Sequence, residues 1–170
     1  MINPFLRNII RFILLLFFQI AILNNIHLGG FINPYLYILF ILLLPFETPK
    51  WLLLIASFAI GISVDMFSDT TGIHAAACVF MAFCRPAVIN FVSSNQGYEP
   101  GIKPIIRDLG FNWFFIYSLL LVLAHHLVLF FLEVFSLSEF FYTLYRVILS
   151  TIFTLIIIII SQYIIYRKKK

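Results

Sequence analysis

Charged residues are scarce in this sequence. Only 11% of its 170 residues are Asp, Glu, Lys or Arg, whereas soluble domains carry about 25%. Polar stretches long enough for a separate soluble domain are also lacking, and 63% of the residues are hydrophobic, with a mean hydropathy of +1.08. A water-soluble fold could not bury that much apolar surface. The composition therefore predicts an all-α, polytopic membrane protein in which residues 1–170 form a single transmembrane domain.

Cysteine is nearly absent as well. The two cysteines, Cys78 and Cys84, fall in one apolar run. On a helix they would lie about 9 Å apart, which is too far for a disulfide. We interpret both as small buried hydrophobic residues, with a metal or redox site as the alternative.

Recognisable catalytic motifs are missing too. The sequence contains no nucleophile and base pair, phosphate-binding loop, zinc-ligand spacing or dinucleotide fingerprint. Its basic residues stand singly between apolar runs or at the C-terminal end, a pattern that suits an anionic membrane surface better than a nucleic acid. We therefore expect a protein that is not an enzyme, with no catalytic residue, metal ligand or cofactor and no nucleic-acid partner, in contact with membrane lipids.

What the sequence does have is a series of long apolar runs. They cover residues 5–23, 31–46, 51–67, 72–92, 111–135 and 140–166, which predicts about six transmembrane helices. The second run is the weakest, because a helix over 31–46 would be only about 24 Å long. Pro34 and Pro45 frame this run, so a short or partly re-entrant segment is the alternative. The first run carries two arginines near its start, as a signal peptide would, but no small-residue cleavage site follows it, and we interpret it as an uncleaved helix.

The distribution of basic residues predicts the orientation. With six spans, the outer loops 24–30, 68–71 and 136–139 contain no lysine or arginine. The inner segments hold Arg7, Lys50, Lys103, Arg107 and the basic tail 167–170. Because basic residues near span ends prefer the cytoplasm, we expect a multi-pass protein of the bacterial cytoplasmic (inner) membrane with both termini in the cytoplasm.

Several ionisable residues fall within or beside the apolar runs. Gly61, Asp65 and Asp69 form a G-x-x-x-D-x-x-x-D pattern, which would place both carboxylates on one helical face, where they could hold a cation. The alternative is a helix end that exposes its acids to outer water. Arg146 shares a depth with Asp65 and Glu133, so these residues are candidates for an interhelical polar contact within the membrane.

Three further polar residues lie inside the runs. We expect Arg85 to extend its side chain towards the membrane interface. His125 and His126 are adjacent and would point about 100° apart on a helix, which disfavours a shared metal ion. Hydrogen bonds to neighbouring helices are the simpler interpretation of this pair.

Small residues gather in the fourth run, where Ala75, Ala76 and Ala77 follow one another. Because small side chains let helix backbones approach closely, we predict that Ala76 and Ala77 mark a docking surface for a partner helix.

Residues 33–82, together with one position in the first run, carry a set of proline, glycine and polar residues that resembles a known family. The set consists of Gln19 in the first run and of Asn33, Pro34, Pro45, Gly61, Asp65 and Gly72. The pattern resembles the central region of MreD, the rod-shape-determining membrane protein of bacteria, in which a proline begins and another closes a short second span. In that family the next helix ends in G-x-x-x-D. The last two runs of this chain match the family only in hydropathy.

The resemblance implies a non-catalytic subunit of the cell-wall elongation complex, which synthesises peptidoglycan and helps determine cell shape. It implies MreC as direct partner, and RodA, a class B penicillin-binding protein and MreB as indirect ones. The family also resembles, in fold, the substrate-binding subunits of energy-coupling-factor transporters. A small-molecule or vitamin-binding subunit of such a transporter is therefore the alternative function. A vitamin site needs several polar side chains at one depth. The sequence offers a thin set near the outer side: Asp65, Asp69, His74, Glu133 and Arg146.

Overall fold

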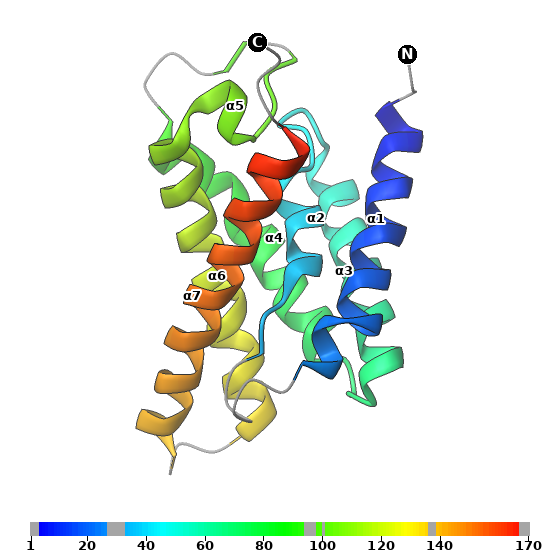
Figure 1. Cartoon of the computed structure of the whole chain (residues 1–170), viewed down its shortest axis with the longest axis vertical. Helices are drawn as coiled ribbons and strands as arrows, with labels where there is room; N and C mark the ends of the chain where they lie inside the picture. Colours follow the sequence, from blue (N-terminus) through cyan, green and yellow to red (C-terminus); the bar gives the residue numbers. More distant parts are fainter. Residues whose placement is uncertain (1–3, 27–32, 94–97, 100, 136–138, 167–170) are drawn as a thin grey trace.

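A computed structural model describes residues 4–26, 33–93, 98–99, 101–135 and 139–166 of the chain. Its elements, in chain order, are α1 (Pro4–Ala21), η1 (Leu23–Asn25), η2 (Leu36–Ile38), α2 (Leu39–Leu42), α3 (Lys50–Ser68), α4 (Ile73–Val92), α5 (Ile106–Leu109), α6 (Phe111–Val134) and α7 (Phe140–Ile165). These described residues contain helices and no strand, and the helices stand side by side in one bundle (Figure 1). The structure confirms the all-α prediction.

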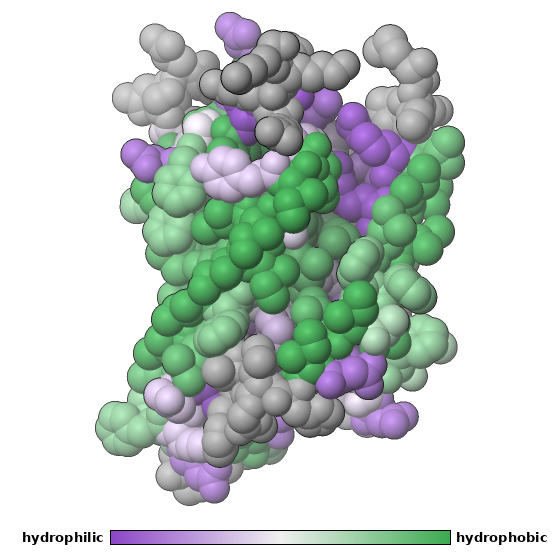
Figure 2. Space-filling view, viewed as in Figure 1, coloured by the Kyte–Doolittle hydropathy of each residue, from purple (hydrophilic) through white to green (hydrophobic). Residues whose placement is uncertain are grey.

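Five helices are long and apolar enough to cross a membrane. They are Leu6–Asn25, Lys50–Ser68, Ile73–Val92, Phe111–Val134 and Phe140–Ile165, close to five of the six predicted runs. Their outer faces are apolar: Phe83 is 73% exposed and Phe17 is 61% exposed. Figure 2 shows hydrophobic residues over the middle of one face and hydrophilic ones towards its two ends. Such a surface belongs in hydrocarbon, so the chain is a polytopic membrane protein.

The second predicted run is not a transmembrane helix. Residues 33–44, here called the central segment, begin without regular structure, form the short η2 and end in the four-residue α2. This corrects the expectation of a sixth apolar helix over 31–46, although Pro34 and Pro45 do frame the segment. Figure 1 shows it running through the middle of the bundle. Its core is fully enclosed, since Tyr37 and Ile41 are 0% exposed.

Side chains from the surrounding helices satisfy the backbone at the start of the central segment. Gln19 of α1 donates from Nε2 to the carbonyl oxygen of Pro34 at 3.2 Å and accepts the N–H of Leu36 at 2.8 Å. Thr154 of α7 accepts the N–H of Tyr35 at 3.1 Å. Because unpaired backbone groups are costly at membrane depth, these bonds allow a non-helical segment to lie there.

A second set of side chains binds the carbonyl oxygens at the end of the central segment. The donors are Tyr117 to Leu42 at 2.9 Å, Arg11 to Leu43 at 3.0 Å, and Arg85 to Leu44. The Arg85 side chain also donates to Tyr117 Oη at 2.8 Å, and the residue is only 2% exposed. This corrects the expectation that Arg85 extends to the interface. The guanidinium instead binds a backbone carbonyl oxygen just after α2, inside the bundle.

The two described chain ends, Pro4 and Tyr166, lie at the same end of the bundle (Figure 1). The N-terminal end of α3, with Lys50, and α5, with Arg107, lie there too. We call it the basic end. From it α1, α3 and α6 lead to the opposite end, and the central segment, α4 and α7 lead back (Figure 1).

Candidate functional site

The turn between α3 and α4 at the opposite end is built around Asp65. This residue is 1% exposed, and its carboxylate accepts the backbone N–H of His74 at 3.1 Å, that of Ala75 at 2.8 Å, and the hydroxyl of Thr70 at 2.5 Å. The first N–H groups of a helix have no partner within the helix, and they favour a negative charge. Asp65 therefore caps α4 from the neighbouring helix.

Gly61, one turn before Asp65, allows α3 and α4 to approach closely. A Cβ atom at this position would lie 2.5 Å from the Cα of Ala75 and 2.8 Å from the carbonyl oxygen of His74. Gly72 precedes α4 in a left-handed conformation, with φ of 89°, which glycine adopts without steric cost. The G-x-x-x-D motif and the following glycine thus shape one tight connection between helices.

The same geometry removes the basis for a cation site at Asp65 and Asp69. Asp69 lies just after α3 in a left-handed conformation, with φ of 52°, so the two carboxylates do not share a helical face. In the part of the chain that the structure describes, no group of three or more His, Cys, Asp and Glu residues is placed to hold a metal ion. Cys78 and Cys84, both described, are free thiols.

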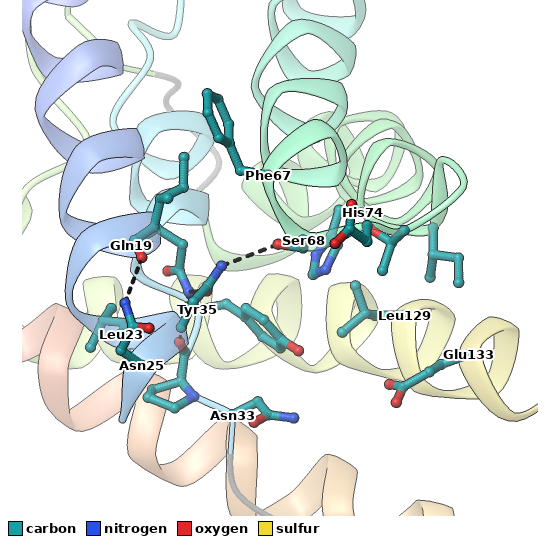
Figure 3. A pocket seen from close by; sticks show the side chains of 16 residues that line it. Gln19, Leu23, Asn25, Asn33, Tyr35, Phe67, Ser68, His74, Leu129 and Glu133 are labelled. Carbon is teal, nitrogen blue, oxygen red and sulfur yellow. Dashed lines mark hydrogen bonds between the residues drawn. The ribbon is translucent and has the colours of Figure 1, made fainter. Parts of the chain in front are cut away.

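A cavity of about 610 Å³ opens beside this turn, at the opposite end of the bundle. The described residues around it come from α1, the central segment, α3, α4 and α6, as Figure 3 shows for Gln19, Tyr35, Ser68, His74 and Glu133. Its volume is in the range of small-molecule sites. Of its described lining residues, Asp69 and Glu133 are acidic and none is lysine or arginine, so its chemistry suits neutral polar or cationic molecules.

A chain of hydrogen bonds leads from this cavity into the bundle. The hydroxyl of Tyr37 lies 2.9 Å from Nδ1 of His74 and 2.9 Å from Nε2 of His125. A hydroxyl has one proton, so it donates to one ring and accepts from the other. Nδ1 of His125 is buried without a partner among the described residues, and an unpaired lone pair is less costly there than an unpaired N–H. We infer that His125 donates to Tyr37 and that Tyr37 donates to His74, which leaves the Nε2 proton of His74 for the cavity.

His126 belongs to a separate chain of bonds. Its Nδ1 lies 2.8 Å from the carbonyl oxygen of Val122 and must therefore carry a proton. Its Nε2 then accepts the hydroxyl of Thr154, at 3.3 Å, and that same hydroxyl accepts the N–H of Tyr35. The two adjacent histidines thus bind different partners, in agreement with the predicted interhelical hydrogen bonds.

Of the three residues predicted to form an intramembrane polar contact, the structure brings two together. Arg146 of α7 binds Glu133 of α6 at 3.1 Å, and its guanidinium carbon lies 4.6 Å from the ring centre of Phe130. Asp65 does not join them, because its carboxylate is occupied at the start of α4. The Glu133 side chain is 43% exposed, so the pair is a partly solvated helix contact, which contributes little to stability.

The two alanines predicted to form a docking surface point in different directions. Ala77 is 0% exposed and faces the bundle interior, so it cannot meet a partner. Ala76 is exposed and lines a shallow apolar groove between α3 and α4. The prediction is therefore corrected for Ala77, and Ala76 remains on a lipid-facing surface.

Comparisons of the chain with models of known protein families, with characterised proteins and with solved structures found no match. Its function therefore has to be inferred from the residues themselves and from the resemblance of their pattern.

Sequence reasoning missed the polar residues that act through the central segment. Tyr35 and Tyr37 lie in the second apolar run, and each binds a group from another element. A polar residue within an apolar run is a detectable signal, because it needs a partner at membrane depth. The identity of that partner depends on which helices are neighbours.

Substitutions at Asp65 should separate a capping role from a role for its negative charge. Asp65→Asn keeps one acceptor oxygen and should lower the free energy of unfolding by about 1 kcal/mol, whereas Asp65→Leu leaves the N–H groups unpaired and should cost about 2 kcal/mol. Thermal unfolding in mild detergent measures both, with the exposed Asp69→Asn as control. If Asp65→Asn abolished function while stability and partner binding stayed normal, the negative charge of Asp65 would have to be part of a functional site.

Proposed function

We propose that this chain is a non-catalytic subunit of the bacterial cell-wall elongation complex, similar to MreD, that partners MreC and helps determine cell shape. The observation that carries the proposal is the placement of the motif residues. Gln19 and Pro34 bind one another at the start of the central segment, Pro45 follows its end, and Gly61 and Asp65 join α3 to α4. These residues act in backbone hydrogen bonds, turns or close helix packing, as expected for positions that define a family of assembly subunits.

The distribution of mass supports an assembly role. Most described residues belong to the five apolar helices or to the central segment between them. Such a protein offers lipid-facing helix surfaces and short connections with which to act, so its partners are met within or beside the membrane. A single-span protein such as MreC suits this surface, and through it the complex would reach RodA, a class B penicillin-binding protein and MreB.

We assign the basic end of the bundle to the cytoplasm. Lys50, Lys103 and Arg107 lie at the ends of helices or in connections on that side, whereas the described residues between α3 and α4 contain no lysine or arginine. This asymmetry follows the preference of basic residues for the cytoplasmic side of the inner membrane. Both termini would then face the cytoplasm.

The cavity at the opposite end favours a second candidate function. Its 610 Å³ volume and its amide, hydroxyl, imidazole and carboxylate groups could hold a small polar molecule. With the basic end in the cytoplasm, this cavity would open to the outer side, where a transport subunit receives its substrate. The alternative is therefore a small-molecule or vitamin-binding subunit of an energy-coupling-factor-type transporter.

Depletion of the protein from its bacterial host separates the two functions. If it acts in cell-wall elongation, rod-shaped cells should become round over several generations, because lateral wall synthesis requires the assembled elongation complex. Re-expression of the wild-type chain should restore the rod shape. Light microscopy and uptake of labelled vitamins are measured in the same cultures. Cells that keep their shape but lose uptake of one vitamin would overturn the elongation proposal in favour of the transporter.

A further inference from the structure

A lateral groove separates α1 from α7 at the basic end of the bundle. Its volume is about 590 Å³. The two helices form its walls, and the central segment forms its floor with Leu39 and Leu43. The walls include Ile10 and Leu14 of α1 and Ile164 of α7, all apolar. Figure 2 shows the groove from outside, with a hydrophilic patch beside the green surface of α1 near its upper end.

Two arginines lie at the basic end of this groove, and neither forms an ion pair with an acidic residue in the part of the chain that the structure describes. Arg7 and Arg11 line it from α1, one helical turn apart and on the same face. Arg11 donates to the carbonyl oxygen of Leu43 at 3.0 Å and to the hydroxyl of Tyr166 at 3.2 Å, both neutral groups. Nε of Arg7 is buried, and it has no hydrogen-bond partner among the described residues. The ion pairs of the described residues involve other arginines, so the two positive charges here are uncompensated.

We propose that this groove binds one anionic phospholipid, with its phosphate at Arg7 and Arg11 and an acyl chain along the apolar walls. Guanidinium groups bind phosphate oxygens through paired, charge-assisted hydrogen bonds. A phosphate here would reduce the repulsion between the two arginines, which both line the groove. The inference is independent of whether the chain serves elongation or transport.

The depth of the groove favours a lipid over a transmembrane helix of a partner protein. Its α1 wall extends from Arg7 to Phe18, which is about 16 Å along a helix. That length is close to half of the bilayer's hydrocarbon thickness of about 30 Å, or one leaflet. A spanning helix would need a surface of the full thickness. In a lipid of the leaflet at the basic end, the phosphate lies at the depth of the two arginines. Its acyl chain lies deeper, at the depth of the apolar walls.

Native mass spectrometry of the full chain, stripped of lipid in mild detergent, tests the assignment. The probes are phosphatidylglycerol and phosphatidylcholine with identical acyl chains. We expect roughly tenfold tighter binding of phosphatidylglycerol, and a loss of most of that preference in Arg7→Gln. Leu14→Trp should weaken the binding of both lipids, because the larger side chain fills the groove. Equal binding of the two lipids by the wild-type chain would overturn the proposal.

Matched variants outside the groove control for charge and bulk. Lys50→Gln removes an exposed basic residue at the same end, and Ile13→Trp enlarges a neighbour of Leu14 that is similarly exposed, 59% against 51%. Both should bind phosphatidylglycerol within twofold of the wild type. If Arg7→Gln and Leu14→Trp bound phosphatidylglycerol as these controls do, the lipid assignment would be wrong. The same holds if the two variants kept lipid binding and lost only the binding of a protein partner.

A photoactivatable phosphatidylglycerol tests the unmodified chain, and therefore does not depend on how the variants fold. Cross-links should map to α1 near Leu14 and to α7 near Ile164, the two walls of the groove. Cross-links spread evenly over the exposed apolar residues of α3 and α6 would contradict a defined site. A signal confined to a different pair of helices would do the same.

Discussion

Replacing Arg85 with methionine should lower the free energy of unfolding by about 3–5 kcal/mol, the largest loss that we expect from a single substitution. Methionine has a similar length but no donor, so the carbonyl oxygen of Leu44 and the oxygen of Tyr117 lose their buried guanidinium. Relief of the cost of burying a charge opposes this loss. We expect the loss to dominate, because these acceptors lie where water cannot replace the donor.

Equilibrium unfolding in detergent, followed by circular dichroism, measures this effect. Arg107→Met is the control, since Arg107 is exposed and its ion pair among the described residues is with its neighbour Asp108; it should change stability by less than about 0.5 kcal/mol. Tyr117→Phe removes the hydroxyl between Arg85 and the carbonyl of Leu42. A double-mutant cycle should show coupling between Arg85 and Tyr117. Wild-type stability in Arg85→Met would mean that the guanidinium does not hold the central segment.

Gly61→Leu should destabilise the chain by about 3 kcal/mol, at the upper end of the usual cost of overpacking. The nearest atoms to an added Cβ belong to the backbone of His74 and Ala75, so no side chain can move aside and α4 must shift. That shift also breaks the bonds between Asp65 and the start of α4. Both effects act in the same direction.

Gly61→Ala gives the more diagnostic comparison. In an open helix position this change stabilises by about 1 kcal/mol, because alanine is the better helix former. Here we expect destabilisation, since even one methyl group meets the backbone of Ala75 at 2.5 Å. Ala76→Leu, on the exposed face of α4, should be nearly neutral in the same thermal unfolding assay. A stabilised Gly61→Ala variant would contradict the close packing of α3 and α4.

The transmembrane helices were predictable because their signal is local. Runs of apolar residues gave the bounds of five helices to within a few residues, and Pro34 and Pro45 marked the limits of the central segment. Its short helix was not predictable from hydropathy. The segment depends on side chains of α1, α4 and α7, such as Gln19, Arg85 and Thr154, which come together only in the folded bundle.

Arg85 and Ala77 show why helix faces were harder to predict than helix spans. A nearly uniform apolar run gives no clear amphipathic stripe, so the direction in which Ala77 points could not be read from α4 alone. The interface prediction for Arg85 did not foresee an acceptor for its guanidinium inside the bundle. In the structure the carbonyl oxygen of Leu44, just after α2, accepts from the guanidinium. Asp65 likewise acts across elements, on a helix that begins eight residues later.

Purification of the tagged chain from its host in mild detergent, followed by mass spectrometry, is the most direct test of its assignment to cell-wall elongation. The account predicts that MreC is enriched with the wild-type chain, together with RodA or a class B penicillin-binding protein. A mock purification with an unrelated membrane protein carrying the same tag provides the background. Stoichiometric recovery of a transport ATPase without MreC would contradict the account and establish the alternative.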